Sequence, residues 1–362
     1  MKKILVVDDS ALMRRVLGDI IKSDERFVVA DEARNGLEAL SLLKVTEYDA
    51  VVLDVNMPQM DGIQLLKEMN NQGIKAKVMM ASTTTMDGAA VTLEALELGA
   101  LDFIHKPEWS FKCKDEEFSK QFLRTLNAVC EAKLEAGSRV PDLKKKTKES
   151  LSQVENLVRK QAGRISGNKI VAIAVSTGGP KSLQNVIPFL PEDLNAPVVM
   201  VQHMPAGFTK SLAERLDSMS LIHVVEAQEG DVLEKSTVYV AKSGQHMNLV
   251  KKGNKITVHY TDEPLREGVK PCANYMYESL VGCGYDEVVC VVMTGMGADG
   301  TEGIAHLKEK QKIFCITQEG SSCVVYGMPK AAVKAGLSDM AVDLSSIAQE
   351  IILHVGVTKN GC

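Results

Sequence analysis

Short apolar runs alternate with helix-patterned segments along most of the chain, and this alternation constrains the fold more than any other feature. In the first 125 residues, runs typical of buried strands occur at residues 4–7, 28–30, 50–53, 77–81 and 101–104. Segments with helical spacing separate these runs, at residues 11–21, 36–43, 62–69 and 89–98. Strands that alternate with helices predict a doubly wound parallel sheet, here of five strands.

The alternation resumes after residue 167. Strand-like runs occur at residues 170–175, 197–201, 222–226, 287–293 and 312–317, with helical spacing at 209–216, 275–281 and 303–309. Residues 238–241 and 256–260 flank a turn-rich stretch, and we expect them to form an antiparallel pair. We therefore predict a second, mostly parallel, doubly wound α/β domain.

The length and the stretch between the two halves define the domain organisation. A chain of 362 residues suits two domains better than one. Residues 125–166 contain few aromatic residues, a lysine-rich cluster at 144–148 and no sustained strand pattern. We predict a domain at 1–124, a linker at 125–166 with one helix near 149–161, and a domain at 167–362.

Composition excludes several classes of protein. A net charge of −5 argues against wholesale binding to nucleic acid or membrane surfaces. No stretch approaches the roughly 20 apolar residues of a membrane span, and the amino terminus lacks the apolar run of a signal peptide. The eight cysteines show no CxxC spacing, so we expect buried, reduced thiols. We expect a cytoplasmic monomer without membrane insertion or nucleic-acid binding.

Polar residues follow the strands of the first predicted sheet. Asp8 and Asp9 follow the first strand, Asp54 the third, Ser82 the fourth and Lys106 the fifth. The carboxyl ends of parallel strands meet at one edge, where ligands bind. Three clustered carboxylates repel one another unless a hard cation such as Mg²⁺ lies between them. A single acid in such a place is more often a helix cap, but the five residues together favour a site.

This half resembles the receiver domains of two-component response regulators. The matching residues are Val-Val-Asp8-Asp9-Ser, Leu-Asp54-Val-Asn-Met-Pro58, Gly62, Ala81-Ser82 and His-Lys106-Pro107. The resemblance implies that Asp54 accepts a phosphoryl group from a chemotaxis histidine kinase. It also implies that Mg²⁺ is held by Asp8, Asp9, Asp54 and the carbonyl of Asn56, that Lys106 and Ser82 contact the phosphoryl oxygens, and that Phe103 is the aromatic switch residue.

The second half places Ser176, His203 and Asp299 just after three buried strand runs. If those strands are neighbours, a hydroxyl, an imidazole and a carboxylate meet at one edge of the sheet. Such a group supplies a nucleophile, a general base and a residue that orients the base for acyl transfer. Backbone N–H groups within residues 295–298 are suited to stabilise an oxyanion. Taken singly, His203 could be a core histidine and Asp299 a helix cap.

Two other functions remain open at this point. Gly295, Gly297 and Gly300 form a literal GxGxxG between a strand and a helix, with Glu319 about 20 residues further on, as in dinucleotide-binding domains. Asp299 lies inside that loop, however, where its charge would oppose a pyrophosphate. A DNA-binding response regulator would need a helix-turn-helix with a basic recognition helix, which the α/β pattern and acidic balance disfavour.

The second half resembles the chemotaxis protein-glutamate methylesterase family, which joins a receiver domain to a hydrolase through a linker. The resemblance rests on Val-Ser176-Thr-Gly-Gly-Pro, Val-Gln-His203-Met-Pro, Met-Thr-Gly-Met296-Gly-Ala-Asp299-Gly and Tyr-Gly327-Met-Pro. It implies a Ser176-His203-Asp299 triad without a cofactor, with the N–H of Met296 as oxyanion donor and Thr177 beside the nucleophile. The implied substrates are methylated glutamates, and in many members glutamines, on the cytoplasmic helices of chemoreceptors.

The chain departs from the family pattern in two places. Pro271-Cys272-Ala273-Asn274 stands where Pro-Ser-Val-Asp is usual, which affects substrate preference. Ser82-Thr-Thr-Thr stands where Ser-Ser-Leu-Thr is usual, which affects the contact between domains. We hypothesise that the receiver domain blocks the hydrolytic edge until Asp54 is phosphorylated.

Overall fold

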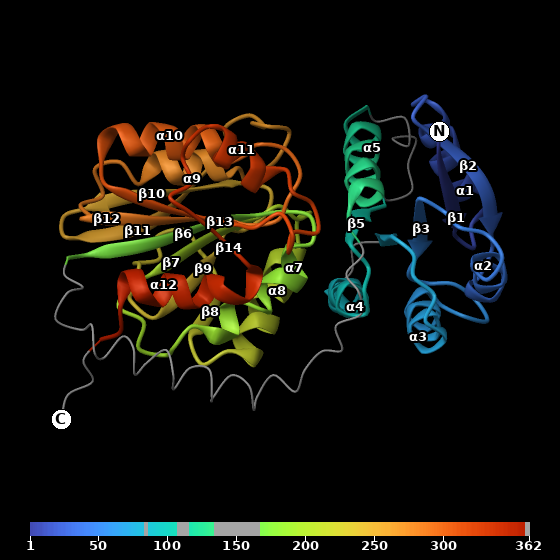
Figure 1. Cartoon of the computed structure of the whole chain (residues 1–362), viewed down its shortest axis with the longest axis horizontal. Helices are drawn as coiled ribbons and strands as arrows, with labels where there is room; N and C mark the ends of the chain where they lie inside the picture. Colours follow the sequence, from blue (N-terminus) through green and yellow to red (C-terminus); the bar gives the residue numbers. More distant parts are fainter. Residues whose placement is uncertain (83–85, 107–115, 134–166, 359–362) are drawn as a thin grey trace. The chain divides into compact units, whose positions relative to one another are not determined.

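The structure is a computed structural model that describes residues 1–82, 86–106, 116–133 and 167–358. The chain divides into two compact units, Met1–Glu135 and Ala136–Cys362, which Figure 1 draws in blue to teal and in green to red. The helix expected near residues 149–161 and most of the predicted linker lie outside the described residues.

The first unit is a five-stranded parallel sheet with helices on both faces, which confirms the fold predicted for it. The strand order is β2-β1-β3-β4-β5. The helices α1 and α5 pack on one face, and their apolar residues share a core with β1, β3 and β4. The elements are β1 (Lys2–Val7), α1 (Ala11–Lys22), β2 (Phe27–Ala33), α2 (Gly36–Leu43), β3 (Ala50–Asp54), α3 (Gly62–Gln72), β4 (Val78–Ser82), α4 (Met86–Glu97), β5 (Asp102–His105) and α5 (Glu116–Glu131).

Local signals in the sequence begin and end the helices of this unit. The side chains of Ser10 and Asn35 cap α1 and α2 by accepting backbone N–H groups. Asp61 and Gln64 form a reciprocal capping box at the start of α3. Gly73 ends α3 with a left-handed backbone (φ 68°), which glycine adopts at little cost.

Helix α5 continues past residue 124, where the first domain was predicted to end. Leu126 and Val129 extend the buried face that includes Phe122, and the ammonium of Lys77 donates to the carbonyl of Cys130 (2.5 Å). The fold of the first unit therefore extends at least to Glu131, because the apolar face of α5 keeps its helical period. The other domain boundaries stay predictions.

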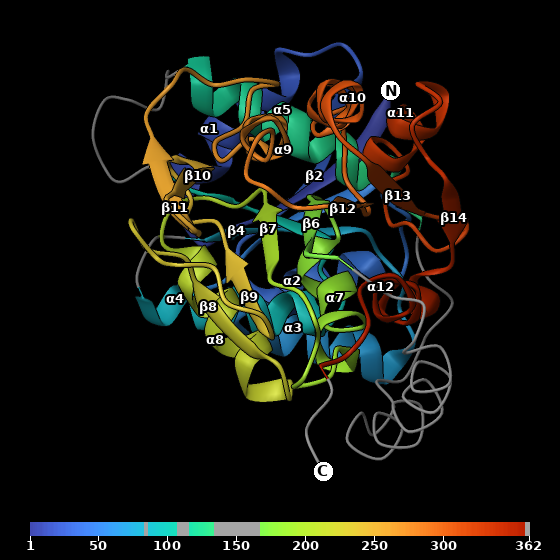
Figure 2. The same cartoon turned by 90° about the vertical axis from the view of Figure 1, so that its left-hand side faces the viewer.

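The second unit is a seven-stranded parallel sheet in the order β14-β13-β12-β6-β7-β9-β8. Figure 2 shows this order across the unit, with α9, α10 and α11 over one face and α7, α8 and α12 over the other. The elements are β6 (Lys169–Val175), α7 (Gly179–Leu183), η2 (Ile187–Phe189), β7 (Val198–Gln202), α8 (Phe208–Met219), β8 (His223–Glu226), β9 (Thr237–Val240), β10 (His246–Lys252), β11 (Lys255–Thr261), α9 (Ala273–Ser279), β12 (Glu287–Val292), α10 (Thr301–Lys310), β13 (Ile313–Gln318), α11 (Met328–Lys334), β14 (Met340–Val342), η3 (Leu344–Ser346) and α12 (Ile347–Val355).

The central strands of this sheet are buried on both faces. All residues of β7 and β12 are buried, as are the last six of β6. The fully buried Tyr277 of α9 donates to the carbonyl of Ala172 or Val291 (3.1 Å each), which links α9 to β6 and β12. A buried hydroxyl without such partners would be costly, so this contact fixes where α9 lies on the sheet.

The antiparallel pair expected between residues 238–241 and 256–260 is wrong. Strand β9 lies in the main sheet, parallel to β7 and β8, and β11 pairs instead with β10. The two-residue turn between Lys252 and Lys255 contains Gly253 at φ 63°, the backbone that a tight hairpin requires. A hairpin between adjacent strands has a small entropic cost of loop closure. The sequence did not indicate β10, because the charged residues at its end obscure the strand pattern.

Among the described residues, no helix is both long and apolar enough to cross a bilayer. The six cysteines that the structure describes are buried and form no disulfide with one another, as expected: Cys130, Cys272, Cys283, Cys290, Cys315 and Cys323.

Candidate functional site

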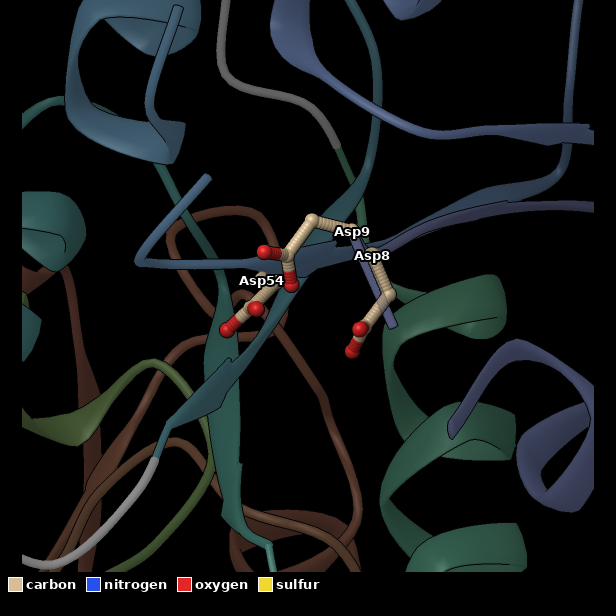
Figure 3. Close-up of side chains that lie close together, drawn as sticks. All are labelled: Asp8, Asp9 and Asp54. Carbon is tan, nitrogen blue, oxygen red and sulfur yellow. The ribbon is translucent and has the colours of Figure 1, made fainter. Parts of the chain in front are cut away.

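Asp8, Asp9 and Asp54 lie together at the carboxyl edge of the first sheet (Figure 3). One carboxylate oxygen from each residue lies within 4.8 Å of the others. The arrangement follows from the topology, because Asp54 ends β3 and the other two residues follow β1, its neighbour in the sheet. The predicted convergence of the three acids is therefore observed.

Lys106 joins this acidic cluster from the end of β5. Its ammonium nitrogen lies 2.6 Å from Asp8 Oδ2 and 2.7 Å from Asp54 Oδ1. Burial raises the pKa of Asp54 to about 6, although the lysine charge opposes this rise. The carboxylates of Asp8 and Asp54 share the ammonium of Lys106, and Asp9 adds a third carboxylate to the cluster. Clustered carboxylate oxygens are the ligands that a hard cation such as Mg²⁺ prefers, so the residues present fit the metal.

The other residues predicted for this site lie around the same edge. Ser82 ends β4, and its carbonyl accepts the backbone N–H of Lys106 (2.8 Å). Phe103 is buried within β5, two residues before the strand ends. Asn56 is exposed in the loop that follows Asp54. The structure brings Ser82 and Lys106 together beside Asp54, because β3, β4 and β5 are consecutive in the sheet.

In the second unit, the three strands that lead to Ser176, His203 and Asp299 are adjacent. Strand β6 pairs with β7 on one side and with β12 on the other. The N–H of Ser176 donates to the carbonyl of Thr294 (3.0 Å), and the N–H of His203 donates to the carbonyl of Val175 (3.1 Å). The three strands are therefore neighbours, which is the condition for Ser176, His203 and Asp299 to meet at one edge of the sheet.

His203 and Asp299 form a buried pair. His203 Nε2 lies 2.7 Å from Asp299 Oδ2, and their side chains are 9% and 0% exposed. Because the carboxylate accepts at Nε2, the lone pair of the neutral ring is on Nδ1. Nδ1 is buried and has no hydrogen-bond partner among the described residues. The ring is thus held on one side and free to accept a proton on the other.

Asp299 is held by the start of α9. Its carboxylate accepts from the thiol of Cys272 (3.0 Å), from the N–H groups of Ala273 (2.7 Å) and Asn274 (3.0 Å), and from its neighbour Gly300 (2.8 Å). Burial alone would raise the pKa of Asp299, but the His203 ring and these donors outweigh it and lower the pKa to about 2. The carboxylate therefore stays ionised at neutral pH.

The loop after β12 lies directly against Ser176. A Cβ atom at Gly295 would lie 2.7 Å from the Cβ of Ser176, a separation that only glycine permits. The next residue, Met296, donates no backbone hydrogen bond to another described residue. Buried Thr177 accepts at its carbonyl from the hydroxyl of Thr294 (3.0 Å). Ser176 itself does not bond His203 Nδ1 in this structure, as is common without substrate.

Gln202 is a site residue that the sequence did not reveal. It is 1% exposed, and its side-chain amide donates to the carbonyl of Ser176 (3.0 Å) and to the carbonyl of His203 (2.9 Å). Gln202 therefore couples the loops that carry the hydroxyl and the imidazole. Its place at the end of β7, directly before His203, was the one available signal.

The GxGxxG segment is not arranged for a dinucleotide. The N–H of Gly300 is occupied by Asp299 and by Asn274 Oδ1 (3.0 Å), and the carboxylate inside the loop faces His203. A pyrophosphate would need free N–H groups and no anion at this helix start. The described residues of the second unit form a parallel sheet with helices, which does not support the DNA-binding alternative.

Comparison with known proteins covers both units. A family model described as CheB methylesterase matches residues 171–351, and one described as response regulator receiver domain matches residues 4–112. The crystal structure of the Thermotoga maritima CheB methylesterase catalytic domain is similar to 52% of this chain and 98% of that chain, with 37% identity and a TM-score of 0.50.

Curated relatives match almost end to end. A protein-glutamate methylesterase/protein-glutamine glutaminase of Pyrococcus horikoshii is 39% identical over 363 residues, which covers 99% of this chain and 95% of the relative. A Bacillus subtilis protein of the same name is also 39% identical, with 97% and 98% covered.

Proposed function

Since the chain belongs to the receiver-linked CheB methylesterase family, we propose that Ser176, His203 and Asp299 hydrolyse glutamate methyl esters on chemoreceptor cytoplasmic helices. The observation that carries the proposal is the buried His203–Asp299 pair, 2.7 Å apart. His203 follows β7 and Asp299 lies in the loop after β12, and these two strands flank β6, which presents Ser176. This combination provides a nucleophile beside a base whose orientation is fixed.

The mechanism begins with proton transfer from Ser176 to His203 Nδ1 while Oγ attacks the ester carbonyl. The tetrahedral oxyanion accepts a hydrogen bond from the N–H of Met296, an interaction that contributes a few kcal/mol in comparable sites. Asp299 stabilises the imidazolium without taking its proton. Collapse of the intermediate breaks the bond to methoxide, which leaves as methanol with the proton of His203.

Water completes the cycle. It attacks the glutamyl ester of Ser176 and gives one proton to His203 Nδ1. Collapse of the intermediate forms the glutamate carboxylic acid, and His203 returns its proton to Ser176 Oγ as the bond between the acyl group and the serine breaks. A glutamine side chain reacts in the same way with ammonia as the leaving group. One triad therefore serves both the esterase and the glutaminase reactions named for the relatives, and the outcome in both cases is a free carboxylate on the receptor.

The first unit would regulate this hydrolysis through Asp54. We propose that Asp54 accepts a phosphoryl group from a chemotaxis histidine kinase, with Lys106 and Ser82 contacting the phosphoryl oxygens. Mg²⁺ would be held by Asp8, Asp9, Asp54 and the carbonyl of Asn56; when bound, it offsets negative charge on the phosphoryl group. Receptor demethylation that follows phosphorylation would provide adaptation of the chemotaxis signal.

The proposal is tested with purified full-length protein and two receptor fragments, one methylated and one with glutamine at the same position. We expect methanol from the first, ammonia from the second, and mutual competition with each inhibition constant equal to the corresponding KM. Methanol without competition would mean that a second site performs the deamidation, and the absence of methanol would overturn the proposed activity.

Regulation is tested separately by adding a small-molecule phosphodonor. The wild type should release methanol faster after the addition, whereas Asp54→Asn should not respond. Asp19→Asn, which changes an exposed acid of α1, is the matched control and should respond like the wild type. A response of Asp54→Asn equal to that of the wild type would contradict the role of Asp54.

A further inference from the structure

The start of α9 contains the segment in which this chain departs from the family pattern, and that segment touches the proposed triad. Cys272 is fully buried, and its sulfur lies 3.0 Å from Asp299 Oδ1. The backbone N–H groups of the next two residues donate to the same carboxylate. The Asp299 carboxylate is therefore shared between these donors and the His203 ring. A stronger donor on the α9 side leaves less negative charge to stabilise a protonated imidazole.

The thiol of Cys272 acts here as a donor. Burial, together with the neighbouring Asp299 carboxylate, raises the pKa of this thiol well above its ordinary value, so it keeps its proton. An S–H group is a weaker donor than a hydroxyl. The carboxylate therefore gives up less of its charge to Cys272 than it would to a serine, and more remains for the imidazole.

Asn274 contributes a neutral group at the same place. Its Oδ1 accepts from the N–H groups of Gly300 (3.0 Å) and Gly303 (2.7 Å), while its Nδ2 is buried and has no partner among the described residues. Gly300 also donates to Asp299, so the amide and the carboxylate share one N–H group. A carboxylate at position 274 could accept the same bonds but would add a second buried charge beside Asp299.

We propose that Cys272 and Asn274 are positioning residues that set the pH at which His203 becomes a free base, by controlling how much charge Asp299 presents to the imidazole. The inference deepens the proposed function, on which its catalytic meaning rests. It predicts opposite effects for two nearly isosteric substitutions. Cys272→Ser strengthens the donor to Asp299 and lowers the pKa of His203, whereas Asn274→Asp adds negative charge and raises it.

The other titratable groups near Cys272 and Asn274 have hydrogen-bond or ion-pair partners of their own. His246 accepts the N–H of Cys272 at Nδ1 (3.1 Å), and burial lowers its pKa. Arg266 is paired with Glu278 and Glu302. Tyr277 bonds backbone carbonyls and stays neutral, because burial raises its pKa well above the ordinary value. These groups are the same in every variant, so differences between variants report the changed residue.

The test is an NMR titration of full-length protein labelled with ¹³C at histidine Cε1, with the His203 signal assigned by its loss in His203→Gln. This readout does not depend on any enzymatic activity, so it separates failure of this inference from failure of the proposed function. We expect the His203 midpoint to fall by a few tenths of a pH unit in Cys272→Ser. We expect it to rise by about half a unit to one unit in Asn274→Asp, and to rise in Cys272→Ala.

Cys283→Ser is the matched control. Cys283 is also buried, and its thiol donates to the carbonyl of Leu249 or of Ser279. Among the described residues, no hydrogen bond links it to Asp299. This variant should keep the wild-type midpoint. In enzyme that releases methanol, the acidic limb of kcat/KM should move with the midpoint. Midpoints unchanged from the wild type, or Cys272→Ser and Cys272→Ala moving in the same direction, would overturn the proposal; this pair decides it even if Asn274→Asp does not fold.

Discussion

Asp299 and Asn274 cap each other's helices. The carboxylate of Asp299 accepts the N–H of Asn274 (3.0 Å) at the start of α9. In return, Asn274 Oδ1 accepts the N–H of Gly300 (3.0 Å), the residue that precedes α10. The residue proposed to orient the base is therefore part of the joint between two helices, and its position does not depend on the histidine alone.

Removal of the amide of Asn274 should weaken this joint. In Asn274→Ala the buried N–H of Gly303 loses the acceptor that lies 2.7 Å away. We expect a loss of about 1–3 kcal/mol in the free energy of unfolding, measured by urea denaturation. Asn185→Ala removes an exposed amide that bonds a carbonyl of α7 and should cost less than about 0.5 kcal/mol. Equal losses of stability in the two variants would contradict the role of Asn274 in joining the two helices.

The pH dependence of stability should report the ionised state of Asp299. Its pKa in the folded protein is about 2, below the ordinary value of about 3.9 in an unfolded chain. The unfolded state therefore takes up a proton first as the pH falls, and the stability that Asp299 contributes above pH 4 is lost as the pH approaches 2.

The comparison is between the wild type and Asp299→Asn, by urea denaturation at several pH values. Between pH 4 and pH 2, the wild type should lose roughly 2 kcal/mol more than the variant, because the amide cannot take up the proton. Parallel stability curves over this range would show that Asp299 is not held ionised by its neighbours.

Much of the site was predictable, because it depends on where buried strands end. Ser176, His203 and Asp299 each follow such a run, and the ends of parallel strands share an edge. The contacts of Gln202 and Cys272 were not predictable in this way. Both depend on where side chains from distant segments meet, which no local period encodes. The hairpin of β10 and β11 was missed for another reason, because the charged residues that end β10 resemble a loop.

Gln202 should affect turnover rather than substrate binding. Gln202→Leu keeps a side chain of similar volume but removes both hydrogen bonds to the carbonyls of Ser176 and His203. A small misplacement of a nucleophile against its base commonly costs 10- to 100-fold in rate. We expect kcat for methanol release to fall by about that factor with KM nearly unchanged.

The control for this substitution is Gln228→Leu, which removes an exposed amide that bonds Glu226 far from the triad in the sequence. It should leave both kinetic constants at their wild-type values. A rise in KM with unchanged kcat in Gln202→Leu would indicate that Gln202 affects substrate binding and would remove its proposed role.

Ser176 is the proposed nucleophile of a methylesterase. The most direct test is the initial rate of methanol release from a methylated receptor fragment by the wild type and by Ser176→Ala, with both proteins verified as folded by their unfolding curves. If Ser176 is the nucleophile, the variant should lose about 10³-fold or more of the rate. Methanol release by folded Ser176→Ala at a rate near that of the wild type would contradict it.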